Sequence, residues 1–111
     1  MNISSNKYKH CDYLAPEGRI DSGTSPAFSE AIELLFKEGR YKIVVDLEKV
    51  TFVSSAGLRV LINTQKTCKR YNRGEIVLCN VPINVHNALD LVGFTTLFKL
   101  FPDTVTAVGN F

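Results

Sequence analysis

The stretch from Ile43 to Asn63 constrains the fold most, because its pattern changes from strand to helix within a few residues. It begins with an apolar, β-branched run at positions 43–47 that only Asp46 interrupts. A run of this kind is typical of a strand covered on both faces, as in parallel sheets with crossover helices. Positions 50–53 continue apolar and extended, and a helical pattern follows. The sequence therefore predicts a strand–helix unit of an α/β fold.

The helix is predicted to begin at the pair Ser54 and Ser55. From Leu58 onward the apolar residues recur at helical spacing, and the other side of the pattern is polar and basic. Serine is one of the preferred residues at a helix N-cap. Gly57 falls in the predicted first turn, where glycine costs about 1 kcal/mol relative to alanine. Its presence predicts that another part of the backbone approaches this turn closely.

Strand and helix patterns alternate along the rest of the chain. We expect positions 1–6 to be loose, a first strand at about 7–14, a short strand at 19–21 and a buried strand at 75–79. Pro26 and Pro82 mark two further helix starts, and Gly39 the end of the first helix. Phe94 and Leu97 are predicted to plug the core. This alternation indicates one α/β domain spanning residues 1–111, with a mixed, mainly parallel sheet.

Composition excludes several classes of function for this 111-residue chain. Its net charge of +2 is too small to argue for a nucleic-acid partner. No stretch reaches the apolar length of a membrane span, and no signal peptide is evident, so we expect a cytoplasmic protein without direct membrane insertion. The three cysteines are interpreted as free thiols in a reducing compartment. No cysteine or histidine pair has the spacing of metal ligands, and neither a metal nor a cofactor is expected.

Two interpretations of the serine pair stay open from the residues alone. The first is that one serine simply caps the helix. The second is that one of them is a regulated hydroxyl, because a helix N-terminus carries unpaired N–H groups and favours an added phosphoryl group. A serine hydrolase is not expected, since the chain lacks the G-x-S-x-G elbow and any glycine-rich phosphate loop. We therefore predict a binding protein and not an enzyme.

The signature of STAS domains, specifically of the stand-alone bacterial anti-sigma factor antagonists, resembles the run VVDLEKVTFVSSAGLRVL at positions 44–61. The similarity continues in GRID before the first helix, in EIVLCNV after the central helix, and in NVHNALDLVGFTTLFKLFPD near the C-terminus. It covers about residues 19–103. The resemblance implies a single STAS domain, in which a mixed four- to five-stranded sheet carries about four helices packed mainly on one face.

The resemblance also implies a partner-switching function. In this family the unphosphorylated antagonist binds a serine/threonine kinase that doubles as an anti-sigma factor, and so frees a client that is often a sigma factor. The kinase uses ATP to phosphorylate a serine of the antagonist, which is then released, and a phosphoserine phosphatase resets the cycle. The alternative is a non-phosphorylated STAS subunit of a transport or ligand-sensing complex, in which the serine would be only a cap. The sequence does not name the kinase, the phosphatase or the downstream process.

Matched to the family motif, Ser55 is the expected phosphorylation site. Ser54 stands where an aspartate is more usual, so it supplies a second hydroxyl and is the fallback acceptor. Asp21 matches an acidic family position beside the phosphorylation loop. Asp46 matches another family acid, and its other reading is that it caps nearby backbone N–H groups. The surface expected to bind the partner comprises Asp21, Ser54, Ser55, Ala56, Gly57 and Arg59.

Overall fold

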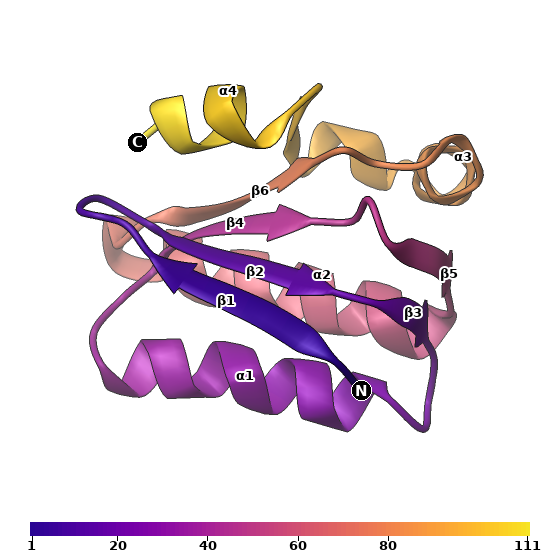
Figure 1. Ribbon diagram of the computed structural model, residues 1–111, viewed down its shortest axis with the longest axis horizontal. Helices are drawn as coiled ribbons and strands as arrows, with labels where there is room; N and C mark the ends of the chain where they lie inside the picture. Colours follow the sequence, from indigo (N-terminus) through magenta and orange to yellow (C-terminus); the bar gives the residue numbers. More distant parts are fainter.

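The computed structural model of the protein describes all 111 residues, apart from the side chains of Tyr71 and Phe94. Strands and helices alternate along the chain (Figure 1). The strands are β1 (Ile3–Lys7), β2 (Asp12–Pro16), β3 (Gly18–Ile20), β4 (Lys42–Asp46), β5 (Val50–Val53), β6 (Glu75–Cys79) and β7 (Lys99–Phe101). The α-helices are α1 (Ser25–Lys37), α2 (Ser55–Lys69), α3 (Ile83–Leu91) and α4 (Thr104–Gly109). Short 3-10 helices follow α2 and α3, at Arg70–Asn72 and Phe94–Thr96.

A five-stranded mixed sheet organises the molecule, with the strand order β1-β2-β4-β6-β7. β2, β4, β6 and β7 run parallel to one another, whereas β1 pairs antiparallel with β2. A separate parallel pair, β3 with β5, lies beyond the end where β2 and β4 finish (Figure 1). The predicted mixed, mainly parallel sheet of four to five strands is therefore confirmed.

Helices cover both faces of the sheet, but unequally. α1 and α2 lie side by side under one face (Figure 1), and α1, α2 and α3 share the larger core with alternate residues of β4 such as Ile43 and Val45. α4 covers the other face, where Ala107 packs against Val44 and Val77. Successive side chains of a strand point to opposite faces, which explains this division. The expectation that the helices pack mainly on one face is confirmed.

The first helix begins and ends where the sequence predicts. Pro26 stands in its first turn, where a missing N–H leaves no bond unmade. At its end Gly39 has a φ of +75°, a left-handed conformation that glycine adopts without steric cost. The Gly39 N–H donates to the Phe36 carbonyl at 2.9 Å and the Arg40 N–H to the Leu35 carbonyl at 3.0 Å, so two of the last carbonyls of α1 are satisfied.

The predicted loose segment at positions 1–6 is a strand instead. β1 and β2 form a hairpin in place of the single strand expected at about 7–14, and its turn contains a bond from the Tyr8 N–H to the Cys11 carbonyl at 2.8 Å. The side chains of β1 are mostly exposed, so no apolar pattern marks this strand in the sequence. Its backbone pairing with β2 orders it.

The predicted core plug near the C-terminus is wrong for Leu97. That side chain is 43% exposed, and the next residue, Phe98, is the buried one. The side chain of Phe94 lies outside the described residues. The backbone of Leu97 contacts the core, since its carbonyl accepts from Nε2 of the buried Gln65 at 2.7 Å.

None of the described helices combines the length and the apolar character that crossing a membrane requires. Among the described side chains, histidine, cysteine and acidic residues form no group of three or more that could hold a metal ion. Cys11, Cys68 and Cys79 are free and buried. Burial raises the pKa of the Cys68 thiol to about 12 and that of Cys79 to about 11, so neither is a reactive thiolate at neutral pH.

Candidate functional site

The serine pair lies where β5 ends and α2 begins, and the pairing of β3 with β5 fixes that junction. The Ser54 N–H donates to the Ile20 carbonyl at 2.8 Å, next to the register pair of Ile20 with Val53. The Ser54 carbonyl accepts from the Leu58 N–H at 2.9 Å, the first turn of the helix. Ser54 itself has an extended backbone, as N-cap residues do. The helix start predicted at the serine pair is confirmed.

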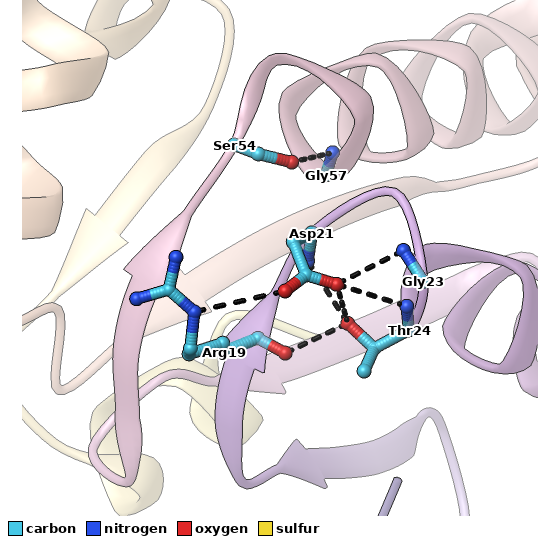
Figure 2. A network of polar contacts seen from close by, with 6 residues as sticks. All are labelled: Arg19, Asp21, Gly23, Thr24, Ser54 and Gly57. Carbon is cyan, nitrogen blue, oxygen red and sulfur yellow. Dashed lines mark hydrogen bonds and ion pairs between the residues drawn. The ribbon is translucent and has the colours of Figure 1, made fainter.

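The two serine hydroxyls have different surroundings. The Ser54 Oγ accepts from the Gly57 N–H at 3.3 Å, so Ser54 is the N-cap and its hydroxyl is engaged in the fold (Figure 2). Ser55 is the first residue of α2 and is exposed, and its hydroxyl bonds to none of the described residues. Of these two hydroxyls, that of Ser55 can therefore meet another protein without breaking a bond to the described residues.

Gly57 is the residue that lets α2 begin so close to β3. A Cβ atom at this position would lie 2.8 Å from both Cγ2 and the carbonyl oxygen of Ile20, and 2.9 Å from Cγ1 of Val53. Real Cβ atoms essentially never come this close to a neighbour, and one of these three atoms is backbone. The close approach predicted from the glycine is confirmed, and it holds the serine pair against the end of β3.

The first turn of α2 presents unpaired donors. The first N–H groups of a helix have no partner within the helix, and here the Ser54 side chain satisfies that of Gly57. The N–H groups of Ser55 and Ala56 lie at the positive end of the helix dipole. Arg59 follows Ser55 by four residues, so the two exposed side chains share one side of α2. This arrangement favours an anion on Ser55.

Asp21 lies beside the same junction, in the loop between β3 and α1 (Figure 2). Its Oδ1 accepts from the N–H groups of Gly23 at 3.0 Å and Thr24 at 3.1 Å, while its own N–H donates to Oγ1 of Thr24 at 2.9 Å. The bond from the Thr24 N–H, followed by that from Gly23, lowers the pKa of Asp21 below its ordinary value. The result is an ionised carboxylate in a fixed orientation near Ser54.

Two residues beside Asp21 were missed by the sequence reasoning. The guanidinium of Arg19 lies 4.3 Å from the centre of the Phe52 ring. Its Nε lies 3.6 Å from Oδ2 of Asp21, and Figure 2 shows this ion pair. Phe52 is 40% exposed. The register of β3 and β5 pairs Arg19 with Phe52, so this contact depends on a strand pairing that neither segment reveals alone. It adds an exposed cation and an aromatic ring to the surface around the serines.

Ala56 and Arg59 extend the site toward α1. Both line a groove of about 280 Å³ between α1 and α2, which Ser29 and Glu33 line from the α1 side. The groove begins one residue after Ser55, so a partner that contacts the serine can also enter it. The structure thus brings five of the six predicted partner-binding residues together at the start of α2 and the adjacent loop, and sets Arg59 one turn further along α2.

Asp46 belongs to a different network, on the α4 face of the sheet. Its Oδ2 accepts from the Tyr13 hydroxyl at 2.6 Å and from the Thr104 hydroxyl at 3.3 Å, and its Oδ1 accepts from the Glu48 N–H at 2.9 Å. Burial, followed by the bond to Asp46, raises the pKa of Tyr13. The bond from Glu48 supports the reading of Asp46 as a cap for backbone N–H groups.

Comparisons with known proteins bear on the chain as a whole. The family model of the STAS domain matches residues 2–107. BtrV of Bordetella bronchiseptica, named as a candidate anti-sigma factor antagonist, is 26% identical over 111 residues, which cover 100% of this chain and 95% of BtrV.

Solved structures share the fold. An anti-sigma factor antagonist from Mycobacterium paratuberculosis superposes with a TM-score of 0.87 at 22% identity, over 98% of this chain and 92% of that one. The Bacillus cell fate determinant SpoIIAA, in its phosphorylated form, superposes with a TM-score of 0.75 at 12% identity, over 98% of both chains.

Proposed function

Because the chain belongs to the STAS domain family, we propose that it is an anti-sigma factor antagonist that is switched by phosphorylation of Ser55. In the unphosphorylated state it binds a serine/threonine kinase that is also an anti-sigma factor, and the client of that kinase is released. Phosphorylation of Ser55 ends this binding, and a phosphoserine phosphatase restores it. The proposal assigns the protein to the bacterial cytoplasm, where the kinase obtains ATP. The proposal is supported by the similarity to BtrV and to the compared structures, whose names describe anti-sigma factor antagonists or, for SpoIIAA, a phosphorylated form.

The observation that carries the proposal is the division of roles between the two serines. The Ser54 hydroxyl caps α2, whereas the Ser55 hydroxyl is exposed and makes no bond to the described residues. A kinase can therefore add a phosphoryl group to Oγ of Ser55 without removing the cap. The fallback acceptor, Ser54, would have to give up its bond to the Gly57 N–H, which exposes an orphan donor at the helix start.

The modification would change binding and leave the fold intact. A phosphoryl group on Ser55 adds about −1.5 to −2 charges at neutral pH. The positive end of α2 stabilises such a charge by about 0.3–1 kcal/mol, and pairing with Arg59 four residues later adds about 0.2–0.5 kcal/mol. A partner packed over the same turn would have to desolvate the phosphate, which costs several kcal/mol unless the partner supplies cations. The charge therefore favours release of the partner.

Asp21, Ala56 and Arg59 are proposed to form the partner-binding surface around Ser55, and the predicted contact residue Gly57 is buried beneath it. Asp21 offers an ionised carboxylate whose Oδ2 lies 3.6 Å from Nε of Arg19 and accepts no hydrogen bond from the described residues. Ala56 and Gly57 leave the first turn of α2 free of bulk. Arg59 leads from this turn into the groove between α1 and α2. Such a surface fits a partner that presents a basic side chain to Asp21 and backbone or small side chains to the helix start.

The test is a phosphorylation assay with the kinase captured by the wild-type protein from its native cell. Ser55→Ala should bind the kinase but incorporate no phosphate, whereas Ser54→Ala should incorporate it at Ser55. Ser55→Asp should weaken binding by about 2 kcal/mol or more if the serine is desolvated in the complex. Equal labelling of Ser55→Ala and wild type would refute the assignment. Circular dichroism of each variant checks that the fold is retained.

A further inference from the structure

A basic pocket lies at the opposite end of β4 from the serine pair. It has a volume of about 240 Å³ and is formed by the β1–β2 turn, the loop after α1 and the segment after α2. In Figure 1 this is the end where β1 turns into β2 and where the chain passes from α1 to β4. Its charged lining residues are Lys9, Asp12, Arg40, Lys42 and Arg73. Four cationic residues and one acidic residue thus line the pocket, which gives a net charge of +3 when His10 is counted as neutral.

Arg40 is locked in place at the pocket. Its Nε donates to Oδ2 of Asp12, and its terminal amino group donates to the carbonyls of Tyr8 at 3.0 Å and Cys11 at 3.3 Å. These bonds tie α1 to the β1–β2 turn. They also fix a guanidinium at the wall of the pocket before any ligand arrives, which lowers the entropic cost of binding.

Arg73 is oriented from the other side. It donates to the Tyr41 hydroxyl at 3.1 Å, and its guanidinium lies 5.1 Å from the centre of the Tyr41 ring. The Tyr41 ring stacks in turn on Phe36, with 5.0 Å between ring centres. A second planar cation is therefore supported by an aromatic stack that reaches into the core.

Lys9 and Lys42 supply the remaining charge. Both are exposed, and the described acidic side chains form no ion pair with either of them. Asp12 therefore offsets the charge of Arg40, whereas no described ion pair offsets the charges of Lys9 and Lys42, although Lys42 lies opposite Glu75 in the strand register. Cations of this kind attract a small anion, and flexible ammonium groups can close on it.

Asp12 favours an anion that can itself donate a hydrogen bond. It lines the pocket, its side chain is 2% exposed, and its Oδ1 is a buried oxygen that accepts no hydrogen bond from the described residues. A buried carboxylate oxygen without a donor is costly, by about 1–3 kcal/mol. Hydrogen phosphate combines negative oxygens for the cations with one P–OH group that can donate to a carboxylate. Sulfate has the same size and charge at neutral pH but no hydrogen to donate.

We propose that this pocket binds inorganic phosphate in its hydrogen phosphate form, with Arg40, Arg73, Lys9 and Lys42 on the negative oxygens and Asp12 accepting from the P–OH group. The site is separate from the serine pair and does not depend on the proposed switching function. Binding there would join the β1–β2 turn, the end of α1 and the segment after α2 through one ligand.

The proposal is tested by titrating the ¹⁵N-labelled full chain with phosphate and with sulfate at pH 7 and constant ionic strength. Phosphate should cause saturable amide shifts at residues 9–12 and 39–42, with sulfate binding more weakly. Lys9→Gln combined with Lys42→Gln should raise the dissociation constant for phosphate about tenfold, since each removes a charge about 5 Å from the anion in a solvated site. The matched control is Lys37→Gln combined with Lys66→Gln, which removes the same charge from exposed positions that do not line the pocket.

Shifts that rise linearly without saturation, or that spread over the whole surface, would overturn the proposal. If the control double variant loses as much affinity for phosphate as the pocket double variant, the binding depends on net charge alone and the pocket is not the binding site. Equal affinity for sulfate would show that Asp12 does not accept a hydrogen bond from the ligand. It would therefore refute the assignment of hydrogen phosphate as the ligand.

Discussion

Replacing Gly57 by alanine should destabilise the protein by about 2 kcal/mol, although alanine is the better helix residue. The added methyl group would lie 2.8 Å from a backbone oxygen and a methyl carbon of Ile20. Overpacking of this kind typically costs about 1–3 kcal/mol. If α2 moves away to relieve it, the bond from the Ser54 N–H to Ile20 weakens, at a cost of about 1 kcal/mol. The higher helix propensity of alanine offsets about 1 kcal/mol of this cost, so the net effect is still a loss of stability.

The assay is urea unfolding followed by circular dichroism, with thermal melts as a second measure. For a domain of this size, 2 kcal/mol corresponds to a fall in melting temperature of about 8 °C. Gly109→Ala is the matched control, because Gly109 ends α4 and a Cβ there would meet no atom within 4 Å. It should stay within about 0.5 kcal/mol of wild type. If Gly57→Ala is as stable as this control, the junction relaxes freely and the close approach does not require glycine.

Three further outcomes are expected. Ser54→Ala should lower the free energy of unfolding by about 0.5–1 kcal/mol in the same urea assay, because it removes a cap whose bond is rather long at 3.3 Å. Gln65→Leu should lower the free energy of unfolding by about 2–4 kcal/mol. Gln65 is buried, and its amide group bonds the Ile76 N–H and the carbonyls of Ile76 and Leu97, which would lose their partner. A melting temperature equal to that of wild type would contradict this. The pKa of Asp21 is lower in the folded protein than in the unfolded chain, where it is near 3.9. The ionised carboxylate therefore stabilises the fold above that unfolded pKa, and this stabilisation is lost as the pH falls through the lower folded pKa. Melts from pH 7 to pH 2 should therefore show wild type and Asp21→Asn converging at the acidic end, and a constant difference would argue against the loop bonds as its source.

The junction of β5 and α2 could be predicted because its signals are local. An N-cap serine, a glycine in the first turn and an apolar stripe each act within a few residues, and together they fix where the helix begins. The glycine also predicted a close approach of another part of the backbone, but the sequence did not indicate which atoms approach it. Ile20 lies more than thirty positions earlier, and only the pairing of β3 with β5 brings it there.

Features that depend on pairing between distant segments were missed. β1 has no apolar face, so its order comes only from backbone bonds to β2. The contact of Arg19 with Phe52 follows from cross-strand register, which local patterns do not encode. The basic pocket joins three loops in the same way, and its residues look in the sequence like scattered surface charges.

The geometry also explains why a serine can stand where the family motif more usually has an aspartate. Ser54 occupies the N-cap of α2, and serine and aspartate are about equally good at accepting a bond from the third helical N–H. The substitution therefore keeps the structural role of the position. It also removes a negative charge from the residue next to Ser55, so a phosphoryl group added there meets less like-charge repulsion. Under the proposed function, Ser54 would therefore assist a switch at Ser55 and would not compete with it, because its own hydroxyl is already used to begin the helix.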